Sequence, residues 1–448
     1  MLVFYCILWQ ITRIGLKNMP KLKLKNGNIV TPGGVVKTDL GIIDGIILLE
    51  TAGLDFDQVI DIEGKYVLPG FIDIHFHGYK GFNDSLGQYN ADTRKFEASD
   101  EIFEAGFDML SEKMAEFGTT GFYLATSAAS PQALNMCCRA LGRYIKKHET
   151  GFSHAKIFGN FLEGSFYNKD MAGAQNTNFI FDFTKEAFDS IDDGGVIKLA
   201  NVAPEMDEKS IALTKYLTEK GIIVGAGHTN ASCAQFEASM KAGLKYCVHF
   251  TNGPTGGSYK PFDGGGTIEA VLKHDDIYAE LILDGCHVNP AYVRDIINRK
   301  GIDKIVGITD CGFIAGADIK EAHTGAVIAK VSEDGRYISV AGKKNVLAGS
   351  NLTMNRGFEN LLNWLCSDMG GIWNKKHQAM PLEQALTATA KMCATNACKL
   401  TGLAEKGLGS ITQGYVADLC LVDITRQNDG YSLNVEKTIV DGKIVYQK

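Results

Sequence analysis

The chain has 448 residues, enough for one large domain with a full hydrophobic core and a smaller second domain. Its net charge of −7, without any basic run, argues against a nucleic-acid partner. The eleven cysteines are scattered without a Cys-x-x-Cys pair, which argues against a disulfide framework and is typical of the reducing cytoplasm.

The N-terminal segment contains an apolar run of about nine residues, which is too short to span a membrane. It also lacks the leading positive charge and the clear cleavage site of a signal peptide. An alternating strand pattern starts after Met19, a candidate initiator. We therefore expect residues 1–18 to be an extension without a role in the fold, and we expect a cytoplasmic protein with no membrane partner.

Both ends of the chain are patterned as short strands separated by turns. This texture covers residues 20–67 and returns in residues 409–424 and 437–446. Alternating apolar and polar residues bounded by glycine and asparagine are typical of strands and hairpins. We predict that residues 19–67 and 401–448 pair into one small β-sandwich domain.

Between these ends, short apolar runs alternate with longer helical patterns. Several of the helical segments end in glycine, a common helix stop. The alternation predicts an α/β fold with a (β/α)8 TIM-like barrel over residues 68–400. The predicted barrel strands are residues 67–77, 120–126, 156–164, 196–205, 221–229, 246–251, 279–288 and 304–311.

The first predicted barrel strand ends in His75-Phe76-His77. Side chains two positions apart on a strand point to the same face, so both imidazoles project together. Neutral imidazole is a common protein ligand of borderline divalent metals. Because the chain has ten histidines, this pair alone does not distinguish a metal site from a chance pair.

Polar residues also lie at the carboxyl ends of other predicted strands, where (β/α)8 barrels carry their active sites. Such a convergence on one rim is hard to attribute to chance, and it predicts a metal site there. The residues are His75 and His77 in strand one, Glu163 in strand three, His228 in strand five, His249 in strand six, His287 in strand seven and Asp310 in strand eight.

From about residue 20 to its end the chain resembles the amidohydrolase superfamily, and within it the N-acetylglucosamine-6-phosphate deacetylases. PGFIDIHFHG, NFLEGSFYNKDMAGAQN, GAGHTNAS, VHFTNGP, GCHVNP and ITDCGFIAG resemble the family's motifs in their order and spacing. The resemblance implies that Asp310 is the catalytic acid/base. It also implies that the metal ligands are His75, His77, Glu163, His228, His249 and Asp310.

The resemblance implies a cofactor of one or two divalent metal ions. Family members with His-x-His in strand one can hold two ions, and this chain keeps His77. A second site of His75, His77 and Asp310, with Glu163 bridging, is therefore expected. Zn and Fe both suit these nitrogen and oxygen ligands, and the choice between them stays open.

The activity implied by the resemblance is hydrolysis of the N-acetyl group of N-acetylglucosamine 6-phosphate, giving glucosamine 6-phosphate and acetate, in amino-sugar catabolism. The glycine-rich loop after strand six supports an anion site, since its backbone can offer N–H groups. A homodimer is also implied, because the cationic residue of this loop can come from a neighbouring subunit. The implied substrate-binding residues are Gln175, Asn252, Gly253, Lys260 and His287.

Some positions depart from the family pattern. Gln175 stands where histidine is usual and cannot become a cation, and Lys260 stands where arginine is usual. The segment 78–100 is long and polar and could act as a lid. Other interpretations remain beside the leading one. The same hydrolysis could act on N-acetylgalactosamine 6-phosphate, on an unphosphorylated sugar or on an N-acyl amino acid. More remotely, the barrel could be a non-catalytic binding protein.

Overall fold

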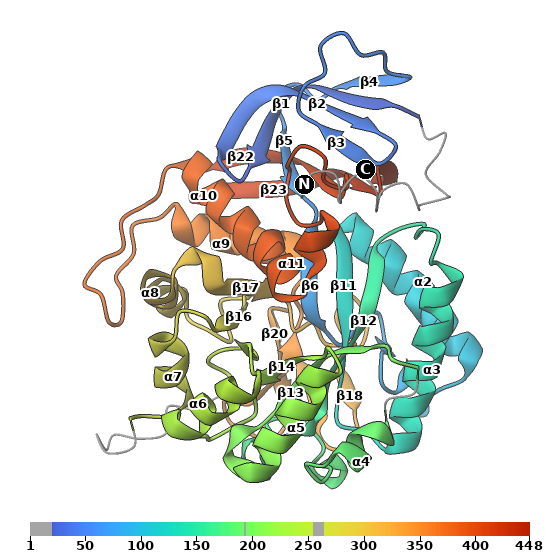
Figure 1. The fold of residues 1–448 in the computed structure, drawn as a ribbon, viewed down its shortest axis with the longest axis vertical. Coiled ribbons are helices and arrows are strands. Elements are labelled where there is room, and N and C mark those ends of the chain that lie inside the picture. Colours follow the sequence, from blue (N-terminus) through green and yellow to red (C-terminus); the bar gives the residue numbers. More distant parts are fainter. Residues whose placement is uncertain (1–19, 192–193, 254–263) are drawn as a thin grey trace.

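In the computed structural model, residues 20–191, 194–253 and 264–448 are described, so the predicted extension 1–18 and Lys260 lie outside the described residues. The predicted (β/α)8 barrel is confirmed: eight parallel strands pair in sequence order (Figure 1). They are β6 (Phe71–Phe76), β11 (Thr119–Thr126), β12 (Lys156–Phe166), β13 (Ile197–Val202), β14 (Ile223–Ala226), β15 (Tyr246–Cys247), β16 (Tyr278–Ile282) and β17 (Ile305–Ile308).

The barrel closes between its first and last strands. A parallel bridge joins Phe76 to Cys311, just beyond the end of β17. The N–H of Asp310 donates to the carbonyl of His75 at 2.9 Å, and the N–H of His77 donates to the carbonyl of Cys311 at 3.0 Å. The closing hydrogen bonds therefore connect the segments that carry the predicted site residues of strands one and eight.

Helices surround the barrel, and α2 (Asp100–Glu116) illustrates their formation. The Ser99 side chain caps its first turn by accepting the N–H of Ile102 at 3.2 Å. Phe103, Phe107 and Leu110, at helical spacing, are buried. The other helices are α3 (Pro131–Lys147), α4 (Lys185–Asp189), α5 (Glu208–Glu219), α6 (Cys233–Ala242), α7 (Thr267–Lys273), α8 (Pro290–Lys300), α9 (Met354–Leu365), α10 (Leu382–Ala390) and α11 (Asn396–Leu400). Among the described helices, none combines the length and apolar character needed to cross a membrane.

The two ends of the chain join in a second sheet above the barrel (Figure 1). Strand β5 pairs in parallel with β1 and antiparallel with β22, and so links the two ends. Apolar side chains from both halves pack into one core. The boundaries at 67/68 and 400/401 stay predictions. The strands are β1 (Leu22–Thr31), β2 (Gly34–Ile43), β3 (Ile46–Leu48), β4 (Gln58–Asp61), β5 (Tyr66–Pro69), β22 (Leu419–Gln427), β23 (Gly430–Val440) and β24 (Lys443–Gln447).

A buried ion trio joins this sheet to the amino-terminal end of the barrel. Lys156 begins β12, and its Nζ lies 2.8 Å from Asp418 Oδ2 and 2.8 Å from Asp441 Oδ1. Burial by itself lowers the pKa of Lys156, but the two carboxylates outweigh burial and raise it above its ordinary value. Lys156 is therefore a charged link between the two parts of the molecule.

Two small antiparallel sheets are inserted near the carboxyl ends of the barrel strands. The segment 78–100, long and polar in sequence, contains the strands of the first sheet, β7 (Gly78–Tyr79), β8 (Phe82–Asn83), β9 (Gly87–Asn90) and β10 (Lys95–Glu97). The second has β18 (Glu321–His323), β19 (Ile328–Val331), β20 (Tyr337–Val340) and β21 (Leu347–Ser350). Tyr89 connects them, since its hydroxyl accepts the N–H of His323 at 3.1 Å. The 78–100 segment is thus anchored to the second sheet.

Candidate metal centre and active site

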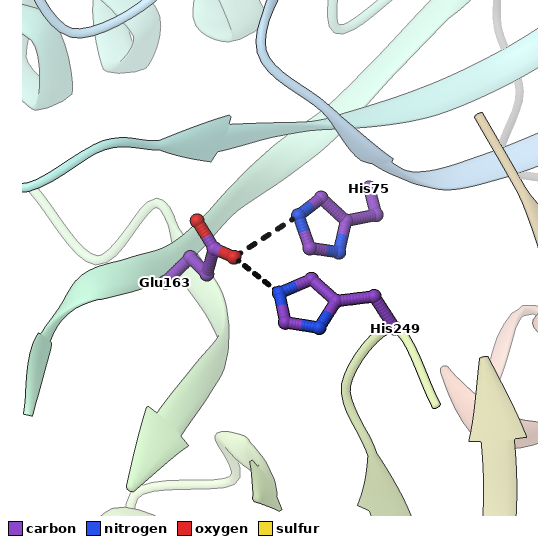
Figure 2. A group of neighbouring side chains, drawn as sticks. All are labelled: His75, Glu163 and His249. Atoms are coloured by element: carbon purple, nitrogen blue, oxygen red, sulfur yellow. Dashed lines mark hydrogen bonds and ion pairs between the residues drawn. The ribbon is translucent and has the colours of Figure 1, made fainter. Parts of the chain in front are cut away.

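The site is centred on Glu163, which β12 places at the carboxyl end of the barrel. Figure 2 shows its carboxylate facing the imidazoles of His75 and His249. Glu163 Oε1 lies 3.4 Å from His75 Nε2 and 2.9 Å from His249 Nε2. The same oxygen lies 3.1 Å from His228 Nε2. Strands far apart in the sequence therefore place three imidazole nitrogens around one carboxylate oxygen.

A second cluster shares His75 with the first. Asp310 Oδ1 lies 3.2 Å from His77 Nε2 and 3.6 Å from His75 Nε2. The Nε2 atoms of His75 and His77 are 3.2 Å apart, so the two side chains, two positions apart where β6 ends, project together. His75, Glu163 and His249 form one group able to hold a metal ion, and His75, His77 and Asp310 form another. All the predicted ligands thus lie together, although their roles stay predictions.

The hydrogen bonds of two histidines define which ring nitrogen faces the centre as an acceptor. His228 Nδ1 lies 2.9 Å from the carbonyl oxygen of Met171, which can only accept, so Nδ1 carries the proton. His75 Nδ1 lies 3.1 Å from a carboxylate oxygen of Glu280. In the neutral rings, both Nε2 lone pairs then point at the Glu163 carboxylate, which is itself an acceptor. A cation is needed between them, and this nitrogen and oxygen donor set fits a divalent metal.

Electrostatics indicate the same need for positive charge. Burial by itself lowers the pKa of His75, but Glu163 and Glu280 raise it well above its ordinary value. Burial by itself raises the pKa of Glu163, but His75, His228 and His249 hold it well below its usual range. The carboxylates therefore favour positive charge at the imidazoles, and a divalent ion held between neutral rings would supply it.

Three site residues have left-handed backbone conformations. The φ angles are 47° at His228, 27° at His249 and 50° at Asp310. For residues other than glycine such angles are uncommon and cost on the order of 1–3 kcal/mol each, and they cluster at functional sites. Each of these residues follows the end of a barrel strand, so the chain turns where its functional side chain enters the site.

Gly253 and Asn252 follow His249 and shape the same rim. A Cβ atom at Gly253 would lie only 2.3 Å from His249 Cε1 and 2.8 Å from the backbone nitrogen of His228. Only glycine therefore fits against this imidazole. Asn252 is exposed and donates its backbone N–H to the carbonyl of His249 at 2.7 Å. These contacts make Gly253 a packing partner of the centre, while its predicted substrate contact stays a prediction.

The centre opens into a cavity of about 620 Å³, a size suited to a small molecule. His287 lines this cavity, and its Nδ1 lies 2.6 Å from Asp284 Oδ2. Burial by itself lowers the pKa of His287, but Asp284 outweighs burial and raises it. A residue of the second inserted sheet, Lys343, also lines the cavity. His287 is thus a fixed imidazole on the cavity wall.

Gln175 lies against the centre and is engaged by its protein neighbours. Its Oε1 accepts the N–H of Ala128 at 2.7 Å, and its Nε2 donates to Glu163 Oε2 at 2.5 Å. The side chain therefore fixes the carboxylate oxygen that faces away from His228 and His249. Its predicted contact with substrate stays a prediction.

Two buried carboxylates near the centre are absent from the predicted site. Glu280, in β16, is fully buried and contacts His75. Asp84 follows β8 and donates its N–H to the carbonyl of His77 at 3.3 Å. Burial raises the pKa of Asp84 well above its ordinary value. A single glutamate within the apolar run of residues 279–283 was the available sequence signal for Glu280.

Comparison with known proteins gives consistent matches along most of the chain. A sequence model described as the amidohydrolase family matches residues 66–445. An N-acetylglucosamine-6-phosphate deacetylase of Bacillus subtilis is 30% identical over 422 residues, covering 90% of this chain and 93% of the relative. The crystal structure of a Thermotoga maritima N-acetylglucosamine-6-phosphate deacetylase matches with a TM-score of 0.74 at 25% identity, covering 95% of this chain and all of that one.

A further structural match concerns the fold alone. It is a mutant N-acetyl-D-glucosamine-6-phosphate deacetylase of Mycobacterium smegmatis, solved in complex with N-acetyl-D-glucosamine-6-phosphate. Its TM-score is 0.76 at 21% identity, and the match covers 96% of this chain and all of the other. The overall fold of the chain therefore has a counterpart in a protein solved with a phosphosugar.

Proposed function

The chain belongs to the amidohydrolase family, and on this premise we propose that it hydrolyses the N-acetyl group of N-acetylglucosamine 6-phosphate to give glucosamine 6-phosphate and acetate. The observation that carries the proposal is the convergence of Glu163, His228, His249 and Asp310 at the base of one small-molecule cavity. This geometry supports metal-dependent amide hydrolysis. The substrate is proposed from the names of relatives that match along most of their length.

Glu163, His228 and His249 would hold one divalent ion, and His75, His77 and Asp310 would hold a second. We propose Zn or Fe, one or two ions per chain, because both metals suit imidazole and carboxylate ligands. A bound ion supplies Lewis acidity, which makes water a stronger nucleophile and polarises the acetyl carbonyl. The protein's contribution is the fixed direction of the Nε2 atoms and of the shared carboxylate.

Asp310 is the proposed proton carrier. Burial by itself raises its pKa, but His77 and His75 outweigh burial and lower it, so its carboxylate is ionised at neutral pH. It takes a proton from the attacking water as the new C–O bond forms. It returns that proton to the amine nitrogen as the C–N bond breaks, which leaves acetate and the free amino sugar.

The substrate's phosphate would lie on the side of the cavity formed by Asn252, Gly253 and His287, with Lys260 from the following loop. His287 supports this because its ring is fixed by Asp284 and its pKa is raised. Gln175 would face the acetyl group from beside Glu163. We further propose that the protein is a homodimer, because the motif resemblance implies that the cationic residue of this loop can come from a neighbouring subunit. We also propose that it lies in the cytoplasm.

The test of the proposed function is acetate release by metal-loaded protein. We expect rapid release from N-acetylglucosamine 6-phosphate, and much slower release from unphosphorylated N-acetylglucosamine, N-acetylgalactosamine 6-phosphate and N-acyl amino acids. Removing the metal with a chelator should abolish release, and adding Zn²⁺ back should restore it. Protein that contains metal but prefers one of the other substrates would contradict the proposed substrate, while the amidohydrolase chemistry would stand.

Replacing His287 with glutamine should weaken recognition of the phosphate. A hydrogen bond to a charged group contributes about 1.5–3 kcal/mol, so KM for the phosphorylated sugar should rise roughly 10- to 100-fold with little change in kcat. Steady-state kinetics on phosphorylated and unphosphorylated substrates would measure this. Cys286→Ser, at the neighbouring cavity position, is the control. An equal rise in KM for both substrates would show that His287 does not contact the phosphate.

A further inference from the structure

We propose that Glu280 is a positioning residue that orients two of the candidate metal ligands at once. The proposal rests on the proposed function, because it concerns the metal that this function needs. Glu280 lies in the middle of β16, within an apolar strand, and its side chain is fully buried. A buried carboxylate is costly unless its charge is compensated, so its presence in a barrel interior needs a physical reason.

One oxygen of Glu280 contacts both neighbours. Its Oε2 lies 3.1 Å from His75 Nδ1 and accepts the backbone N–H of His249 at 2.9 Å. Since an ionised carboxylate only accepts, the His75 contact holds the proton on Nδ1. His75 Nε2 is then the unprotonated nitrogen, and it is the atom that faces Glu163 and Asp310. Glu280 thereby selects the tautomer of His75 that can bind a metal.

The contact with His249 acts on the backbone. His249 follows β15 and has a φ of 27°, a conformation that a non-glycine residue adopts only when its surroundings hold it there. The hydrogen bond to Glu280 fixes the peptide N–H of His249 in this position. Strand seven of the barrel therefore holds ligands that come from strands one and six.

The second oxygen of Glu280 adds an electrostatic argument. Oε1 is buried and has no hydrogen-bond partner among the described residues. Both of the hydrogen-bond contacts described for the carboxylate are therefore made by Oε2, which lies against His75 and the backbone of His249. A carboxylate behind a ligand histidine raises the basicity of the ligand nitrogen, and removing such a partner typically costs 10- to 100-fold in metal affinity.

Two substitutions separate orientation from charge, and a third controls for burial. Glu280→Leu removes both hydrogen bonds, whereas Glu280→Gln keeps an oxygen that can accept from His75 and His249 but removes the charge. Asp295→Asn is a matched control, because Asp295 is a fully buried carboxylate that also accepts from an imidazole (His377 Nε2, 2.7 Å) and from a backbone N–H (Ile372, 2.7 Å). Neither Asp295 nor these two partners line the cavity of the candidate site.

The readouts are Zn²⁺ affinity by competition with a chelating dye and the visible spectrum of the Co²⁺-loaded protein. We expect Glu280→Leu to lose 10- to 100-fold in Zn²⁺ affinity and to change the Co²⁺ spectrum, and Glu280→Gln to lose about tenfold with a spectrum close to wild type. Asp295→Asn should keep both properties even where its melting temperature falls. A purely structural role of Glu280 would lower the melting temperature without changing affinity or spectrum.

Failure of this inference is distinguishable from failure of the proposed function. If the wild-type protein binds Zn²⁺ and releases acetate while both Glu280 variants keep wild-type affinity and spectrum, the inference is overturned and the function stands. If the wild-type protein binds Zn²⁺ but releases no acetate from any proposed substrate, the function fails and the affinity series still decides the inference. If Glu280→Leu does not fold, unchanged Zn²⁺ affinity in folded Glu280→Gln overturns the inference.

Discussion

Asp310→Asn is expected to abolish nearly all acetate release while leaving the protein folded and able to bind metal through Glu163, His228 and His249. Asparagine has the shape of aspartate and still offers an acceptor oxygen, but it cannot take a proton from water or return one to the leaving amine. Loss of such a proton carrier costs about 100- to 10,000-fold in rate. The measurement is kcat for N-acetylglucosamine 6-phosphate, with metal content determined on the same sample.

The control for this prediction is Asp334→Asn, which changes an exposed carboxylate in the turn between β19 and β20 whose ion-pair partner is Arg336. This variant should retain the wild-type rate. Asp310 also belongs to the second group of candidate ligands. If the wild-type protein binds two ions, the Asp310→Asn variant is therefore expected to lose one of them. Near-normal kcat in Asp310→Asn would show that another group moves the proton, and the assignment of Asp310 would then be wrong.

Among the substitutions proposed here, Lys156→Met is expected to destabilise the protein most, by about 3–5 kcal/mol in the free energy of unfolding. Removing the lysine leaves Asp418 and Asp441 buried together at the junction of the barrel and the second sheet, without their cation. Urea denaturation and the melting temperature would measure the loss. Lys215→Met, at an exposed lysine 3.9 Å from Glu219, should leave both nearly unchanged.

The loss of stability in Lys156→Met is expected to depend on pH, because it depends on whether Asp418 and Asp441 are ionised. Burial raises the pKa of Asp418 above its ordinary value, although the charge of Lys156 acts to lower that pKa. Without the lysine, the ionised form of the buried carboxylates is disfavoured further. The carboxylates of the folded variant therefore bind a proton more readily than those of the unfolded chain. The penalty is complete above the raised pKa of the folded protein, and it falls as the pH drops below that pKa towards the ordinary value of 3.8. The loss should therefore be larger at pH 8 than at pH 5, and a pH-independent loss would contradict this account.

The barrel could be predicted because its strands are apolar runs that stand out against helical periodicity. Strand β12, for example, is buried along nearly its whole length. The predicted run 246–251 was too long, since β15 ends at Cys247 and the chain then turns through His249. The converging ligands could be predicted because strand ends of parallel sheets share one rim, and strand order alone places them there.

The rest of the site depends on contacts that no local pattern records. The inserted strands are short and mix polar and apolar residues, so β8 and β18 show no clear period. Glu280 appears in the sequence as one charged residue in a strand, and only the folded barrel places it behind His75. The sequence predicts Gln175 as a substrate contact, which stays a prediction, but it does not predict the hydrogen bond from its amide to Glu163.

The pairing of β5 with β22 has a consequence for how the chain folds during synthesis. The paired residues Pro69 and Leu419 are about 350 residues apart, so at about 5–20 residues per second the ribosome needs roughly 20–70 s to supply the partner of β5. Strand β17, which completes the barrel, emerges about 110 residues before β22. The barrel strands are thus available while the first-made strands still present an unpaired edge and an open apolar core. A chain that stops before Leu419 keeps that edge exposed and is prone to aggregate.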